Sequence, residues 1–305
     1  MNIITNFDNK PSVPLVATIG FFDGVHIGHQ HLIGQLRELA AKHGCETAVV
    51  TFAQHPRQAL NADYKPQLLS TITEKEALLA SYGVDHCLVL DFNRSLSEMS
   101  AREFMGNVLS RIGVKYLLIG YDNRFGRNRV DGFDDYVRYG KEIGIEVVEA
   151  TPFKYADICI SSSVTRTFLA EGNVDFAATC LGRPYQLEGI VVHGFSEGRK
   201  IGFPTANLHC TEGKMIPADG AYAVRVMIDE TTYRGMLNIG MRPTLGNGAE
   251  RSVEVHILDF CANIYGRTLR VEFISRLRSE QKFASTDELA AQLRKDVEQV
   301  KRIIR

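Results

Sequence analysis

The sequence lacks several features that would assign it to common classes of protein. No two of its six cysteines stand at C-x-x-C spacing, which argues against a zinc cluster and favours buried, reduced thiols. The first 16 residues have no apolar core of a signal peptide, and no stretch approaches the roughly 20 apolar residues of a membrane span. The formal net charge of −1 does not call for a nucleic acid or an anionic membrane as a partner. We therefore expect a cytoplasmic protein that acts on small molecules.

The first half of the chain alternates short apolar runs with amphipathic helical patterns. The apolar runs are residues 15–19, 47–52, 87–90, 116–119 and 146–148, and the helical stretches are residues 30–43, 74–82, 101–112 and 133–143. Strands that are apolar at nearly every position are typical of a parallel sheet covered on both faces. The alternation therefore predicts an α/β doubly wound, Rossmann-like domain.

From residue 187 the pattern changes to strand-like runs that are separated by turn residues. The runs are residues 187–192, 221–228, 233–239, 252–258 and 269–274. Strands without intervening helices predict a small antiparallel β-barrel. A closing helix is expected to begin near Ser285, because Ser285 and Glu288 fit a capping box.

The boundary between the two domains is expected near Arg183 and Pro184. Two short helical pieces, residues 163–170 and 174–181, precede this point, and no low-complexity linker separates the halves. With 305 residues, 45% of them hydrophobic, the chain can fill two cores. We expect residues 1–183 to form the first domain and residues 184–305 the second.

A glycine-rich turn with two histidines spans residues 20–29 in the first domain. Its glycines let the backbone approach a phosphate, and the following helix offers unpaired N–H groups. His26 and His29 are three residues apart, so both can face one anion and stabilise charge at a phosphoryl centre. The spacing is neither that of a Walker loop nor G-x-G-x-x-G. The alternative is that the two histidines cap an ordinary turn.

This turn resembles the HxGH signature of the nucleotidyltransferases. That superfamily has a second element at a later helix start, and Ser162, Ser163 and Arg166 fit it as ligands for the phosphates of ATP. A serine at this place is also a common helix cap. Further candidates follow other predicted strands, where ligands bind in such sheets. These candidates are His55, Pro56, Asp122 and Phe125.

The second domain has its own candidate site at residues 198–207. Thr205 and Asn207 point the same way on an extended segment, and their oxygen atoms suit Mg²⁺ held jointly with nucleotide phosphates. Gly194, Gly198 and Arg199 form an upstream loop that could cover those phosphates. The alternative is a proline-containing turn with Asn207 as a backbone cap.

Residues 253–258 alternate so that Glu254 and His256 share one face of a strand. A carboxylate that faces a barrel interior is costly or functional, and it suits the role of general base on a substrate hydroxyl. The alternative is a solvent-facing Glu254 on an edge strand. The local sequence leaves both open.

Together these motifs resemble the bifunctional bacterial riboflavin kinase/FMN adenylyltransferases, over nearly the whole chain. The segment 198–207 is much more specific to riboflavin kinases than the histidine turn is to any one transferase. The resemblance implies phosphorylation of riboflavin to FMN by ATP, then adenylylation of FMN to FAD with release of pyrophosphate. It implies Mg²⁺ as a cofactor, and ATP, riboflavin and FMN as substrates. It requires no nucleic acid, membrane or obligate protein partner.

The resemblance also implies roles for matching residues. His26 and His29 would stabilise the adenylyl transition state, and Glu254 would activate the ribityl hydroxyl of riboflavin. The nucleotide-binding residues would be Gly20, Phe22, Asp23, Gly28, Ser162, Ser163, Arg166, Gly198 and Arg199; the flavin-binding residues His55, Pro56, Asp122 and Phe125; and the metal ligands Thr205 and Asn207. The chain departs from the family pattern at Gln54, Asn123 and Thr165.

Two other functions compete with this interpretation. In one, the kinase is retained, but the first domain transfers another nucleotide or is inactive. In the other, the protein binds a flavin or a nucleotide as a sensor, without turnover. The full set of catalytic side chains argues against a sensor, because a pure binding protein would not need it.

Overall fold

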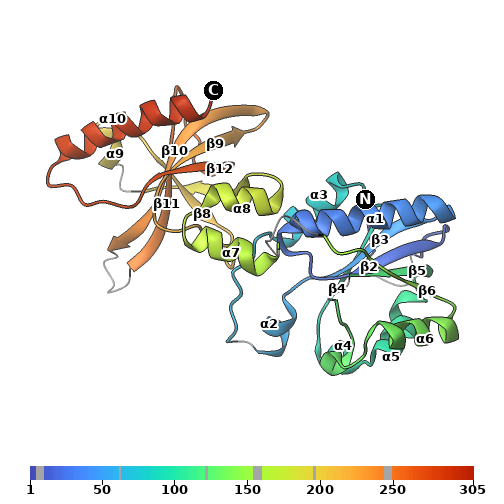
Figure 1. The fold of residues 1–305 in the computed structure, drawn as a ribbon. Helices are drawn as coiled ribbons and strands as arrows, with labels where there is room; N and C mark the ends of the chain where they lie inside the picture. The colour runs from blue at the N-terminus through green and yellow to red at the C-terminus, as the bar shows by residue number, and fades with distance from the viewer. Residues whose placement is uncertain (5–9, 62, 121–122, 154–159, 195–196, 244–248) are drawn as a thin grey trace. The chain divides into compact units, whose positions relative to one another are not determined.

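The computed structural model describes residues 1–305, except 5–9, 62, 121–122, 154–159, 195–196 and 244–248 (Figure 1). It divides into two compact units, Met1–Ile160 and Ser161–Arg305, which are described separately.

Six parallel strands form the sheet of the first unit, in the order β1-β4-β3-β2-β5-β6. The strands are β1 (Asn2–Ile4), β2 (Leu15–Ile19), β3 (Glu46–Phe52), β4 (His86–Leu90), β5 (Val114–Ile119) and β6 (Glu146–Glu149). The helical elements are η1 (Asp23–Val25), α1 (Ile27–His43), α2 (Pro56–Leu60), α3 (Ile72–Ser81), α4 (Arg94–Glu98), α5 (Ala101–Phe104), η2 (Met105–Leu109), η3 (Arg127–Arg129) and α6 (Phe133–Ile143). The predicted doubly wound fold is confirmed, with β1, α2 and α4 as unpredicted additions.

Apolar layers cover both faces of this sheet. All five residues of β2 are buried, as expected for a central parallel strand. Helices α1 and α3 pack on one face through residues such as Leu36 and Leu79, and α5, η2 and α6 pack on the other through residues such as Phe104 and Tyr136 (Figure 1).

The single helix predicted over residues 101–112 is wrong in its details. Helix α5 ends at Phe104, and a π-helical turn, η2, follows it. Met105, Val108 and Leu109 are buried in the core, at a spacing that a continuous α-helix would also place on one face. Hydrophobic periodicity cannot distinguish a continuous α-helix from an α-helix that is followed by a π-helical turn.

The carboxyl end of β2 lies at the switch point of the sheet. The strand pairs with β3 on one side and with β5 on the other. Side chains that follow β2 and β5 therefore meet at one crevice, where doubly wound sheets bind ligands. The Asn123 side chain, which follows β5, donates a hydrogen bond to the Ile19 carbonyl at the end of β2. This bond fixes one wall of the crevice.

The second unit contains a closed antiparallel barrel of strand order β10-β11-β8-β7-β12-β9, as predicted. Its strands are β7 (Tyr185–Val192), β8 (Ala206–Cys210), β9 (Gly220–Ile228), β10 (Thr231–Pro243), β11 (Ala249–Ile257) and β12 (Thr268–Arg278). Its helices are α7 (Ser162–Ala170), α8 (Val174–Leu181), α9 (Glu197–Lys200) and α10 (Thr286–Ile303). Strand β11 pairs with β10 and with β8, so the edge-strand alternative for Glu254 is wrong.

Helices α7 and α8 belong to the second compact unit. The side chain of Arg276, on β12, donates to the carbonyl oxygens of Glu171 and Asp219. The Ala218 N–H donates to the carbonyl of Leu169, at the end of α7. This division falls at residues 160 and 161, whereas the sequence predicted a boundary at residues 183 and 184.

The closing helix begins as predicted. Ser285 is the N-cap of α10 and accepts from the Glu288 N–H, although the Glu288 carboxylate bonds to the Ala284 N–H rather than closing the box. Val300 is fully buried in a cluster with Leu293 and Val297. The expected apolar stripe therefore packs α10 on the barrel.

Candidate active sites

The histidine turn of the first unit has a strained backbone. Phe22 and Val25 have positive φ angles of 54° and 39°, which non-glycine residues rarely adopt, and Gly24 has a φ of 75°. Phe22 is buried, and its ring fills the space that a side chain at Gly20 would need, since a Cβ built there lies 2.9 Å from the ring. Such strain persists only where surrounding contacts enforce it, and it is common at functional sites.

Asp23 supplies the contacts that enforce this turn. Its buried carboxylate accepts hydrogen bonds from the N–H groups of Leu69 and Ser70, at 2.9 and 3.1 Å. The Ser70 hydroxyl in turn accepts from the Gly24 N–H. In the described structure Asp23 thus anchors the loop before α3. The predicted contact of Asp23 with a nucleotide stays a prediction.

His26 and His29 lie against each other at the start of α1. Their rings stack with centroids 3.6 Å apart. His26 is also the N-cap of α1, because its Nδ1 accepts from the His29 N–H at 3.3 Å. His26 therefore caps the helix, as the alternative held, and its ring also lies beside that of His29, as the first interpretation predicted. Since Nδ1 accepts, the neutral His26 ring carries its proton on Nε2.

The start of α1 suits an anion. Its first turn contains no acidic residue, so the unpaired N–H groups and the positive end of the helix dipole are not neutralised. Gly28 leaves room for the His26 ring, which lies 3.2 Å from a Cβ built at that position. A larger residue at Gly28 would push the ring away from the helix end.

The His29 ring is uncharged at neutral pH. Burial lowers the pKa of His29 well below its usual value, and the neighbouring His26 and Lys75 lower it further. His29 keeps some surface exposure as a residue, but its Nδ1 is fully enclosed and has no hydrogen-bond partner among the described residues. His29 can therefore act as a neutral N–H donor, but not as a permanent cation.

The described members of the predicted flavin site lie on two separate segments of the first unit. His55 is the N-cap of α2, Pro56 is its first residue, and the His55 ring meets the Phe21 ring edge-on at 4.9 Å. Phe125 stacks on Tyr136 at 4.4 Å and packs against the core. Asp122 lies outside the described residues. The flavin-binding roles stay predictions.

The serine-rich helix start lies in the second unit. Ser161 is the N-cap of α7 and accepts from the Val164 N–H. Ser162 and Ser163 occupy its first turn, and Arg166 is half-buried one turn later. The chain departs from the family pattern at Thr165. Its hydroxyl is buried and donates a hydrogen bond to the Ser161 carbonyl, so this polar group has a partner. The nucleotide contacts of these residues stay predictions.

The barrel brings together the residues predicted for the second site. Thr205 donates from its hydroxyl to the Glu254 carboxylate at 3.1 Å, and Glu254 lies opposite Asn207 across the β11–β8 pair. Gly194 lies against the buried Asn207, because a Cβ built at Gly194 would fall 2.1 Å from its amide nitrogen. Thr205, Asn207 and Glu254 therefore form one cluster of oxygen-bearing side chains.

His256 holds the segment that carries Thr205. Its Nδ1 lies 2.8 Å from the Pro204 carbonyl, and its ring meets the Phe203 ring edge-on. Sequence reasoning placed His256 on the face of Glu254 but gave it no role. The signal was present in the two-residue spacing, which directs both side chains toward the same neighbouring segment.

A pocket of about 650 Å³ adjoins this cluster. It is lined by Val191, Arg199, Pro204, Thr205, Ala206, Val255, Ile257, Phe260, Cys261, Ala262, Asn263, Ile264 and Tyr265. Its apolar wall with a few polar groups is typical of a small-molecule site. Gly198 lies beside it in α9, where its own carbonyl accepts from the Phe203 N–H.

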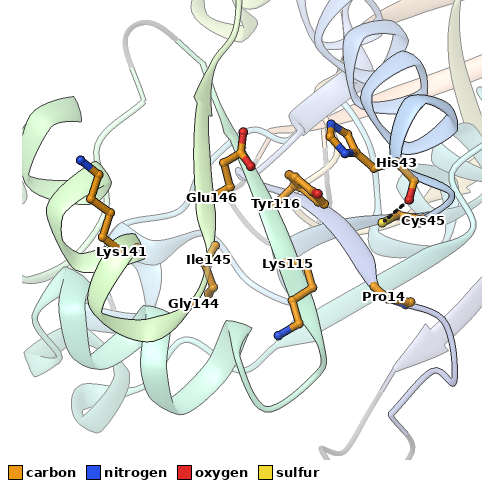
Figure 2. A pocket seen from close by; sticks show the side chains of 10 residues that line it. Pro14, His43, Cys45, Lys115, Tyr116, Lys141, Gly144, Ile145 and Glu146 are labelled. Atoms are coloured by element: carbon orange, nitrogen blue, oxygen red, sulfur yellow. Dashed lines mark hydrogen bonds between the residues drawn. The ribbon is translucent and has the colours of Figure 1, made fainter.

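A different pocket of the first unit, of about 510 Å³, lies at the opposite end of the sheet (Figure 2). Pro14, Cys45, Lys115 and Glu146 line it where their strands begin. It contains none of the predicted site residues, and parallel sheets bind ligands at the other end of their strands.

These two sites define a nucleotide-dependent transferase that has two modules. A strained turn at a helix N-terminus suits phosphate chemistry in the first, and a hydroxyl–carboxylate–amide cluster suits it in the second. Residues 8–164 match the FAD synthetase family and residues 181–304 match the riboflavin kinase family.

Curated relatives match the chain over most of its length. The bifunctional riboflavin kinase/FMN adenylyltransferase of Escherichia coli (strain K12) is 38% identical over 96% of this chain and 94% of its own. The Bacillus subtilis (strain 168) protein of the same name is 35% identical over 92% of this chain and 90% of its own. The chain therefore belongs to the bifunctional riboflavin kinase/FMN adenylyltransferase family, and it phosphorylates riboflavin and adenylylates FMN.

A solved structure has the same fold over 98% of both chains, with a TM-score of 0.90 and 34% identity. It is described as a macrolide-efflux protein from Streptococcus pneumoniae. In the described part of this chain, no helix has the length and apolar character needed to cross a membrane.

Proposed function

We propose that adenylyl transfer takes place at the His26–His29 turn and riboflavin phosphorylation at the Thr205–Glu254 cluster. The stacked imidazoles at an uncompensated helix N-terminus support the first placement most strongly. The hydrogen bond between Thr205 and Glu254 supports the second.

In the first module, we assign His26 and His29 to the oxygens of the α-phosphate. The Nε2–H of His26 and an N–H of the neutral His29 donate to charge that develops as FMN attacks and pyrophosphate leaves. The N-terminus of α1 adds a fixed partial positive charge. Neutral donors of this kind need no proton from solvent before the reaction.

In the second module, Glu254 is the general base on the ribityl hydroxyl of riboflavin. Thr205 and Asn207 provide oxygen atoms of the kind that Mg²⁺ prefers, and both lie beside Glu254. When bound, Mg²⁺ would neutralise charge on the ATP phosphates. Gly198 and Arg199, which were predicted to lie in a loop but form part of the short helix α9, would contact the same phosphates. A cytoplasmic location and the lack of nucleic-acid, membrane or protein partners stay predictions.

One experiment separates the two placements. Purified wild type, His29→Gln and Glu254→Gln are each incubated with ATP and Mg²⁺ plus either riboflavin or FMN, and products are resolved by chromatography. We expect His29→Gln to convert riboflavin to FMN and stop there, with FAD formation reduced by about 100-fold or more. Glu254→Gln should form FAD from added FMN but lose FMN formation to a similar degree.

His43→Gln and Glu188→Gln are matched controls, because His43 is exposed, Glu188 is partly exposed, and both lie outside the proposed sites. Both should keep both activities. FAD formation by His29→Gln at the wild-type rate would remove the first placement. Loss of both activities in Glu254→Gln would indicate misfolding or coupling between the modules.

A further inference from the structure

Lys75 is a buried lysine that the proposed reaction does not yet use. It lies on α3 and is only 2% exposed. Its Nζ donates to the Phe21 carbonyl at 2.9 Å, the Thr51 hydroxyl at 3.2 Å and the Phe52 carbonyl at 3.3 Å. Burying an ammonium group costs free energy even when it is hydrogen-bonded, so such a group usually has a function.

The acceptors of Lys75 come from the carboxyl ends of two neighbouring strands, β2 and β3. Phe21 follows β2 and opens the histidine turn, whereas Thr51 and Phe52 end β3. The ammonium also lies 4.1 Å from the centre of the Phe21 ring, which meets His55 on its edge. One side chain thus joins the histidine turn to the segment that carries His55.

Four titratable groups act on this ammonium. Asp23 of η1 and Glu76 of α3 favour its charged form, Cys87 of β4 would do so only as a thiolate, and the charge of Lys75 opposes protonation of His29 on α1. Burial lowers the pKa of Lys75 to about 8, despite the attraction of Asp23. Burial also raises the pKa of Cys87 to about 12, so that thiol is neutral. Lys75 is therefore charged below pH 8 and loses its charge above it.

We propose that Lys75 is a positioning residue for adenylyl transfer: its ammonium holds the histidine turn against the end of β3 and adds positive charge near the His26–His29 pair. The neutral amine has one N–H fewer for its three acceptors and no charge. The inference rests on the proposed placement of adenylyl transfer at this turn.

The test compares FAD formation from FMN and ATP by full-length wild type and Lys75→Met between pH 6.5 and 9.5. The variant keeps the length of the side chain and removes its donors and charge. We expect kcat at pH 7 to fall by about 10- to 100-fold, as for the loss of hydrogen bonds from a charged donor. The wild-type rate should fall as the pH rises through about 8, and Lys75→Met should lack this decline. Lys141→Met, at an exposed lysine of α6, should behave as wild type.

A second variant keeps the inference testable if Lys75→Met does not fold. Thr51→Val removes one acceptor from the ammonium, so the pH of the decline should move lower and the rate should fall several-fold. Three results would each overturn the role of Lys75. They are a pH dependence that does not shift in Thr51→Val, a wild-type rate that does not change with pH, and a wild-type kcat in Lys75→Met. The His29→Gln result is independent, because it tests the placement of the reaction itself.

Discussion

At the scale of single residues, the first site gathers positive potential without relying on a protonated His29. The pKa of His29 is lowered by burial and by its neighbours, so its ring is neutral at pH 7. Lys75 and the N-terminus of α1 are then the local sources of positive charge. This arrangement suits a polyphosphate ligand, because neither source depends on pH below about 8.

His256 should affect the kinase activity alone. It is bonded to the Pro204 carbonyl, next to Thr205, so His256→Leu removes the contact that holds Thr205 near Glu254. We expect kcat/KM for riboflavin phosphorylation to fall by about 5- to 10-fold, as for one lost hydrogen bond. His256→Asn, whose amide can replace Nδ1, should recover part of this loss. FAD formation from FMN, measured on the same preparations, should not change; an equal loss of both activities would contradict the local role.

The sequence reveals some of these residues and hides others for a physical reason. Period-two alternation predicted that Thr205 and Asn207 share one direction and that Glu254 and His256 share one face, but it left open whether Glu254 faces the barrel interior. Lys75 was missed, since burial of a lysine depends on strand ends that are distant in sequence. A local signal existed: Lys75 stands three and four residues before Leu78 and Leu79, on the apolar face of α3.

At the scale of elements, local periodicity predicts regular segments and fails where the backbone departs from them. The strands other than β1 and β8 were predicted, although β10 and β12 extend beyond their predicted ranges, and helices α6 and α8 have the predicted bounds. The π-turn η2 and the strained turn at Phe22 were not predicted, because tertiary contacts such as those of Asp23 stabilise them. The strained turn is the element on which the first site depends.

Helix α10 should depend on one buried ion pair. Asp296 is 1% exposed and accepts from Arg278 on β12 at 2.9 Å, and from Gln292 at 2.7 Å. Asp296→Ala leaves the Arg278 charge largely buried without this partner, so we expect a loss of about 3–5 kcal/mol in stability of the second unit. Thermal unfolding of the purified protein measures it. Glu298→Ala removes an exposed pair on the same helix and should cost less than about 1 kcal/mol; equal losses would show that the Asp296 pair has no special importance.

At the scale of the whole molecule, the chain divides into two compact units, one with a parallel sheet and one with a closed barrel. Our proposal assigns adenylyl transfer to the end of the parallel sheet and phosphorylation to the closed barrel. The sequence predicted two domains, because its pattern changes from alternating strands and helices to strands without intervening helices. Parallel and antiparallel sheets bury different patterns of residues. The sequence predicted the boundary after α7 and α8, because these helices have the helical pattern of the first unit, whereas in the structure they contact the barrel.

Two fragments should decide where the kinase module begins. Fragment 161–305 retains α7 and α8, whereas fragment 184–305 follows the boundary predicted from the sequence. In the shorter fragment, Arg276 loses the Glu171 carbonyl, and the apolar residues of the barrel that α8 covers become exposed. We expect fragment 161–305 to phosphorylate riboflavin and to unfold at a temperature at least about 5 °C above that of fragment 184–305. Equal unfolding temperatures and activities would place the functional boundary at residue 184, and would make α7 and α8 part of the adenylyltransferase module despite their contacts with the barrel.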